Sequence, residues 1–205
     1  AHEQHSRFSA FIDALKGAGV TFNIHHCCNS AGTLELPDFH RDMIRPGIIQ
    51  YGYDASKEVL VTGTKIKPVM SLRCCITHLK TIYEGDCVGY GRHFTATGPT
   101  KIATLPIGYA DGYNRALSSK IDVIVHGVRA HQVGNICMDQ CMIDIGASPW
   151  VQRWDEVCIF GPVSKEHPKN NTAQDLAKIA GTIPYELTCD INKRVPRIFI
   201  DETIQ

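Results

Sequence analysis

Two segments of this chain carry tyrosine, aspartate and methionine side chains at the ends of predicted strands. They read TLPIGYADGYNR (residues 104–115) and GNICMDQCMID (residues 134–144). In each, an apolar run stops at turn-forming residues, and loops at strand ends usually carry functional groups. Either segment alone is also typical of a packed loop, because Asp and Tyr beside Gly are ordinary turn residues. Together with further segments they indicate a site, with four candidate side chains on loops: Tyr109, Asp111, Met138 and Asp139.

The composition excludes several classes of protein. Lys plus Arg and Asp plus Glu number 21 each in 205 residues, so no net field attracts a phosphate backbone or an acidic membrane surface. The nine cysteines form no CxxC ladder, and we expect no metal site but reduced, mostly buried thiols. The sequence also lacks an apolar run of about 18 residues and a signal-peptide pattern. We therefore expect a cytoplasmic protein that binds neither nucleic acid nor membranes.

The first part of the chain predicts an α/β unit. Apolar residues at helical spacing predict an amphipathic helix over residues 3–17. A short apolar strand that ends in polar residues is expected within residues 20–30, a second helix around residues 31–35, and a second strand over residues 42–52 with a Pro-Gly interruption. This order is typical of parallel α/β structure. Two strands are too few for a parallel sheet, so we expect the chain to be the C-terminal portion of a longer protein.

The pattern changes near Asp54, which predicts a domain junction there. From Val69 to about Phe160, short apolar runs separated by turn residues are typical of an all-β module. Only residues 172–181 look strongly helical, with Thr172 as N-cap and Gly181 at the end. The remaining residues are predicted to form loop and strand.

Five ordered segments share one explanation. They are HHCCNSAG, RPGIIQYG, GDCVGYGRHF, the pair described first, and GTIPYE. In wording and spacing they resemble the pyridoxal-phosphate-dependent alanine racemases, from about residue 20 to residue 200. The resemblance implies an eight-stranded α/β barrel followed by a mainly β C-terminal domain. Residues 1–57 would then be a barrel remnant, the last two βα units, and residues 58–205 the β-rich domain.

The resemblance implies two bases for racemisation. A proton must leave one face of Cα and return on the other, while an electron sink holds the carbanion. One base is the lysine that holds pyridoxal phosphate as a Schiff base in a Lys-Ala-x-Ala-Tyr-Gly type motif, which this sequence lacks. The other is a tyrosine, matched by Tyr90, and because an ordinary phenol is a weak acid at neutral pH, the resemblance implies a cation or hydrogen bond that stabilises its deprotonated form. His26 matches a histidine in the hydrogen-bond chain behind that tyrosine.

The same resemblance implies a set of cofactor-binding residues. The hydroxyl of Ser30 and the phenol of Tyr185 match phosphate contacts, and Gly47 and Ile48 match backbone donors to the phosphate. Arg45 matches a guanidinium beside the pyridine nitrogen, which keeps that nitrogen unprotonated and weakens the electron sink. Quick reprotonation is then favoured over transamination.

Substrate contacts and the assembly follow from the resemblance as well. Tyr109, Met138 and Asp139 match residues that line the substrate entrance. In this family the C-terminal domain of one subunit closes the barrel mouth of the other, so we expect a homodimer with a shared active site. Tyr90 and the entrance residues would serve the partner's barrel.

The predicted function is the interconversion of L- and D-alanine by an isomerase that supplies D-alanine for peptidoglycan. Without the lysine, this chain alone is expected to be inactive. The bulky Tyr185 favours alanine over serine as substrate. A serine/alanine racemase of the same family and a non-catalytic β-domain binding module are the alternatives. A remnant of a related barrel decarboxylase is a further one, although its cysteine motif and acidic pyridine partner are not found here.

Overall fold

The computed structural model describes residues 1–54, 66–146, 148, 150–163 and 168–200. The chain divides into two compact units, a first unit of Ala1–Pro68 and a second unit of Val69–Gln205. The boundary predicted between residues 57 and 58 lies outside the described residues.

The first unit is built from short helices. The helix predicted over residues 3–17 is confirmed as α1 (His2–Gly17), with Glu3 in its first turn and Lys16 in its last, as the helix dipole favours. None of the residues of α1 is buried in the described structure. The second predicted helix is also confirmed, and two short 3-10 helices follow it: α2 (Ser30–Glu35), η1 (Pro37–Phe39) and η2 (Ile48–Tyr51).

The strands predicted within residues 20–30 and over residues 42–52 are wrong at the level of the local backbone. In the described residues the two segments form one isolated parallel β-bridge, between His26 and Met43, and no longer ladder. The bridge does not extend because Pro46 has no N–H to donate and Gly47 leaves the extended region, with φ −123° and ψ −97°. The chain then turns into η2, which replaces the second half of the predicted strand.

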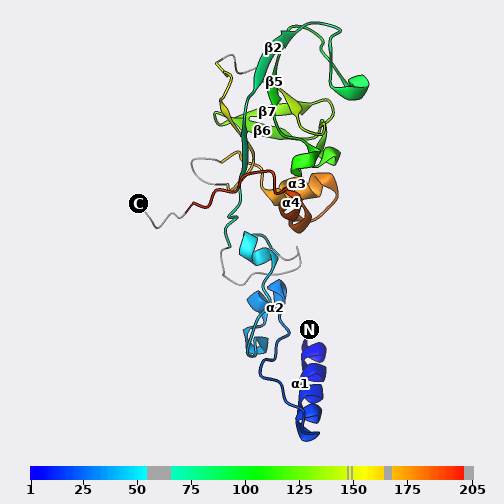
Figure 1. Cartoon of the computed structure of the whole chain (residues 1–205), viewed down its shortest axis with the longest axis vertical. Helices are drawn as coiled ribbons and strands as arrows, with labels where there is room; N and C mark the ends of the chain where they lie inside the picture. Colours follow the sequence, from blue (N-terminus) through cyan, green and yellow to red (C-terminus); the bar gives the residue numbers. More distant parts are fainter. Residues whose placement is uncertain (55–65, 147, 149, 164–167, 201–205) are drawn as a thin grey trace. The chain divides into compact units, whose positions relative to one another are not determined.

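The second unit is mainly β, as the sequence predicted, and most of its strands lie in one antiparallel sheet. Seven strands lie in the order β1-β9-β6-β7-β8-β5-β2, and β3 and β4 form a separate two-stranded hairpin. Figure 1 labels four strands of the large sheet, β2, β5, β6 and β7. The strands are β1 (Leu72–Cys75), β2 (His78–Ile82), β3 (Cys87–Val88), β4 (Phe94–Thr95), β5 (Thr100–Leu105), β6 (Asp122–Val125), β7 (Val128–Val133), β8 (Cys141–Asp144) and β9 (Glu156–Phe160). Three 3-10 helices interrupt them, η3 (Tyr90–Arg92), η4 (Tyr109–Asp111) and η5 (Arg115–Leu117).

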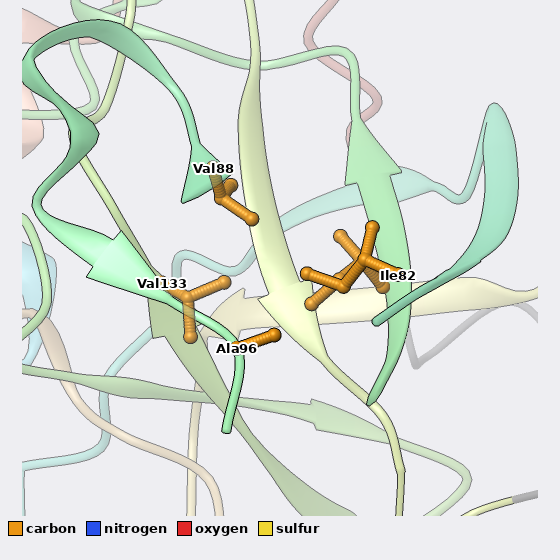
Figure 2. Packing of buried hydrophobic residues seen from close by; sticks show 5 residues of the cluster. Ile82, Val88, Ala96 and Val133 are labelled. Carbon is orange, nitrogen blue, oxygen red and sulfur yellow. The ribbon is translucent and has the colours of Figure 1, made fainter. Parts of the chain in front are cut away.

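A hydrophobic cluster anchors the β3–β4 hairpin on the large sheet. Val88 of β3 and Ala96, just after β4, pack with three buried residues of the sheet (Figure 2), which are Ile82, Ile102 and Val133. Each fully buried valine or isoleucine contributes about 1.5–3 kcal/mol, which stabilises a hairpin that would be marginal by itself. Because η3 connects β3 to β4, this packing fixes the backbone of the hairpin that carries Tyr90.

Two helices follow the last strand and lie side by side in Figure 1. The predicted helix is confirmed as α3 (Ala173–Ala180), with a capping box between Thr172 and Asp175 and a left-handed Gly181 at its end. The prediction of loop and strand after it is wrong, because α4 (Pro184–Asp190) forms there. Proline at the first helical position and burial of Leu187 favour this helix.

The cysteines differ from expectation in their burial. All nine are free, but the prediction that they are mostly buried is wrong. Only three are buried, namely Cys28, Cys141 and Cys158.

Within the residues that the structure describes, we find no helix with the length and apolar character to cross a bilayer. The same residues contain no group of three His, Cys, Asp or Glu side chains that could hold a metal ion.

The cap of α3 provides a test of this part of the fold. The hydroxyl of Thr172 accepts the Asp175 N–H at 3.2 Å, so Thr172→Ala is expected to lower the free energy of unfolding by about 1 kcal/mol. Thr172→Ser keeps the acceptor and is expected to stay within about 0.5 kcal/mol of the parent. Urea denaturation measures both, and equal losses would contradict a capping role for the hydroxyl.

Candidate functional site

The second unit contains a pocket of about 350 Å³ that brings together four of the sequence-predicted site residues. These four come from three separate parts of the chain: Tyr90, Tyr109, Met138 and Asp139. The rest of the lining consists of Arg115, Asn135, Ile136 and Cys137. Tyr185 lies on α4 of the same unit and is not among the residues that line this pocket.

Tyr90 projects from a tightly turned backbone at the tip of the β3–β4 hairpin. The glycines on both sides of it, Gly89 and Gly91, have φ of 72° and 78°, where glycine carries no steric penalty. The side-chain amide of Asn135 donates a hydrogen bond to the Tyr90 carbonyl at 2.8 Å. Tyr90 is 79% exposed. The turn therefore holds the backbone of Tyr90 while its phenol faces outward.

The two segments that first indicated a site run directly against each other. The N–H of Tyr109 donates to the Cys137 carbonyl at 3.0 Å, and the N–H of Ala110 donates to the Met138 carbonyl at 3.0 Å. A Cβ on Gly108 would lie 2.2 Å from the Cys137 carbonyl oxygen, so only glycine fits there without movement. We call residues 108–111 and 137–139 the two-loop wall. It forms the side of the pocket that carries Tyr109 and Met138.

Within the two-loop wall, the carboxylate of Asp111 accepts a hydrogen bond at each of its two oxygens. Asp111 is buried, with 8% of its surface exposed. Its two oxygens accept the Gly108 N–H at 2.8 Å and the Arg194 Nε at 2.6 Å. Arg194 also donates to Asp139 at 2.5 Å, and these two acceptors raise its pKa further above the ordinary arginine value. A buried carboxylate needs such partners, because an unpaired charge is costly to remove from water.

Sequence reasoning missed three polar residues of this region. Arg115 and Asn135 stand inside the two motif segments, so inspection of every polar residue in those segments would have found them. Arg194 stands 83 residues from Asp111, in a part of the chain predicted as loop and strand. No local pattern connects the two, so only the folded structure reveals this pair.

The remaining predicted residues gather in the first unit. The Arg45 guanidinium donates to Nδ1 of His26 and to the Cys27 carbonyl, the latter at 3.2 Å. Because a guanidinium only donates, the first bond places the His26 ring proton on Nε2. The N–H of Gly47 donates to the Ser30 hydroxyl at 2.8 Å.

These contacts depend on the local chain path. The Arg45 N–H donates to the Cys28 carbonyl at 2.8 Å, which brings the segment of His26 beside the segment of Arg45. Ser30 and Ile48 are buried, with 4% and 1% of their surfaces exposed. A hydroxyl, backbone groups at the start of a helical turn and a permanent cation are therefore assembled in this unit.

Comparison with known protein families gives matches over both units. Residues 69–199 match the family described as "Alanine racemase, C-terminal domain". Residues 1–55 match the family described as "Alanine racemase, N-terminal domain".

Curated relatives show similarity along nearly the whole chain. An alanine racemase of Treponema denticola is 60% identical over 203 residues, which cover 99% of this chain and 53% of the relative. Alanine racemase 1 of Clostridium acetobutylicum is 47% identical over 199 residues, covering 97% of this chain and 51% of the relative. The chain thus spans about half the length of the curated relatives it matches.

Solved structures give the same result. Alanine racemase of Clostridium difficile 630 in complex with cycloserine superposes with a TM-score of 0.85 at 38% identity, covering 95% of this chain and 50% of that one. Alanine racemase from Bacillus anthracis with bound L-Ala-P gives a TM-score of 0.89 at 34% identity, covering 98% and 51%.

The close approach at Gly108 can be tested by adding a methyl group. Gly108→Ala is expected to lower the free energy of unfolding by about 1–3 kcal/mol, because the new Cβ overlaps the Cys137 carbonyl. Gly98→Ala is the matched control, since a Cβ there meets nothing within 4 Å, and a change within about 0.5 kcal/mol is expected. Similar denaturation midpoints for the two variants would show that the two-loop wall is not tightly packed.

Proposed function

The chain belongs to the alanine racemase family, and we propose that the whole protein interconverts L-alanine and D-alanine with pyridoxal phosphate as cofactor. The family resemblance inferred from five sequence segments is confirmed. The predicted fold class is confirmed too, a short N-terminal part of the barrel followed by a mainly β domain. The observation that carries the proposal is an outward-facing tyrosine in one pocket with the predicted entrance residues.

The residues of the first unit fit a phosphorylated pyridine cofactor. Ser30 accepts a hydrogen bond from Gly47, so its own hydroxyl proton is available to donate to a phosphate oxygen. Gly47 lets the backbone at the start of η2 approach an anion closely. Arg45 remains charged and would hold a facing pyridine nitrogen unprotonated. When bound, pyridoxal phosphate supplies the electron sink that makes the Cα proton of an amino acid removable.

Tyr90 is proposed as one of the two proton-transfer groups. A phenol acts in this way when its oxygen reaches the Cα proton and its surroundings stabilise both protonation states. The pocket setting supports this role, because the side chain is exposed while its backbone is held by Asn135. The second group, a lysine by family resemblance, corresponds to no lysine in this sequence.

Tyr109, Met138 and Asp139 are proposed to line the substrate entrance. All three are exposed. The exposed fraction is 44% for Tyr109 and 53% for Met138, and it is 62% for the side chain of Asp139. Exposed aromatic and methionine side chains around a pocket are typical of surfaces that become covered. We propose that a second copy of the protein covers them, so that Tyr90 and the entrance residues complete the partner's site in a homodimer. The assembled enzyme would work in the cytoplasm and supply D-alanine for peptidoglycan.

Replacement of Tyr90 tests the proposed reaction. In the full-length protein loaded with pyridoxal phosphate, Tyr90→Phe removes the transferable proton. Racemisation is expected to fall by about 10²–10⁴-fold in both directions. Tyr83→Phe is the matched control, because Tyr83 is 62% exposed and does not line the pocket. Unaltered conversion of L-alanine by the Tyr90 variant would exclude a proton-transfer role.

The choice between alanine and serine is tested at Tyr185. Its side chain is partly exposed on α4, and a bulky phenol favours a methyl over a hydroxymethyl side chain on the substrate. Tyr185→Ser is expected to raise kcat/KM for serine relative to alanine by about tenfold. Tyr185→Phe keeps the ring and is expected to retain the preference for alanine. A preference unaffected by Tyr185→Ser would assign substrate selection to other residues.

A further inference from the structure

Arg194 connects both halves of the two-loop wall. It donates from Nε to Asp111 and from its terminal nitrogen to Asp139. Among the described residues, two backbone hydrogen bonds, from the N–H groups of Tyr109 and Ala110, join residues 108–111 directly to residues 137–139. We propose that Arg194 is a positioning residue that sets the place of Asp139 and Met138 at the pocket rim.

Backbone contacts of the segment before Arg194 hold this residue beside the two-loop wall. The Asn192 N–H donates to the Asp111 carbonyl at 3.0 Å. The side chain of Asn192 in turn accepts the Arg194 N–H at 3.1 Å. A Cβ on Gly112 would lie 2.2 Å from the Asp190 carbonyl oxygen, so the end of α4 approaches the chain closely just after Asp111. The guanidinium therefore starts from a fixed point beside the wall.

The two carboxylates have different surroundings and different roles. The Asp111 side chain is 12% exposed and lies outside the pocket lining, whereas the Asp139 side chain is 62% exposed and lines the pocket. Asp111 consequently anchors the guanidinium, and the guanidinium holds Asp139. A planar fork can bond two separate carboxylates at once, whereas a lysine ammonium acts as a single compact charge.

The arrangement has a consequence for an anionic substrate. Without the guanidinium, the rim carries the unpaired negative charge of Asp139, which repels the carboxylate of an approaching amino acid. The reacting groups themselves stay in place, because Tyr90 is held by the hairpin and Asn135. Loss of Arg194 is therefore expected to weaken substrate binding more than proton transfer.

Kinetics of the full-length protein provide the first test, and this readout rests on the proposed function. Arg194→Met is expected to raise KM for alanine about tenfold, with kcat changed by less than about threefold. Arg194→Lys is expected to recover part of the loss. Adding Asp139→Asn to Arg194→Met removes the unpaired charge and is expected to lower KM again. Arg197→Met is the control, since Arg197 donates to the Ile191 carbonyl and is expected to leave both constants unchanged.

A second readout does not depend on activity. Hydrogen exchange of the Tyr109 and Ala110 amides, which donate across the wall, is expected to be faster in Arg194→Met and unchanged in Arg197→Met. This result in a protein that fails to racemise alanine would support the positioning role while the proposed function fails. Unchanged exchange in Arg194→Met would overturn the inference whatever the activity, and so would a KM increase shared by Arg197→Met.

Discussion

The pocket depends on the close contact between the backbone at Gly108 and the carbonyl groups of Cys137 and Met138. The sheet prepares this contact, because β5 and β8 are antiparallel neighbours with Leu105 opposite Cys141. The segment that follows β5 and the segment that precedes β8 therefore lie at the same end of these two strands. With no side chain at Gly108, their backbones can form two direct hydrogen bonds, and Tyr109 and Met138 lie on one wall.

The position of Tyr90 follows a different physical rule. Its hairpin has strands of only two residues, too short to persist without other contacts. Burial of Val88 and Ala96 against the large sheet supplies the missing stability, and left-handed glycines turn the tip outward. The exposed phenol is thus attached to a hairpin that the hydrophobic core keeps in place, and proton transfer requires such fixed positioning.

In each unit an arginine guanidinium donates hydrogen bonds to two separate acceptors. In the first unit Arg45 donates to the ring of His26 and to a backbone carbonyl. In the second unit Arg194 divides its donors between a buried and an exposed carboxylate. An exposed ion pair adds little stability, so the value of the contact to Asp139 lies in the geometry that it imposes on the pocket rim.

The sequence by itself determined the elements that depend on neighbouring residues. The ends of α1 and α3, the short antiparallel strands and the loop positions of Tyr109 and Met138 were predictable, because caps, turns and alternation act over a few residues. Only the tertiary structure decided the features that need distant partners. Arg194 pairs with a residue 83 positions away, and the predicted strands of the first unit shorten to one bridge. Pairing across such separations depends on the path of the folded chain, which local patterns do not encode.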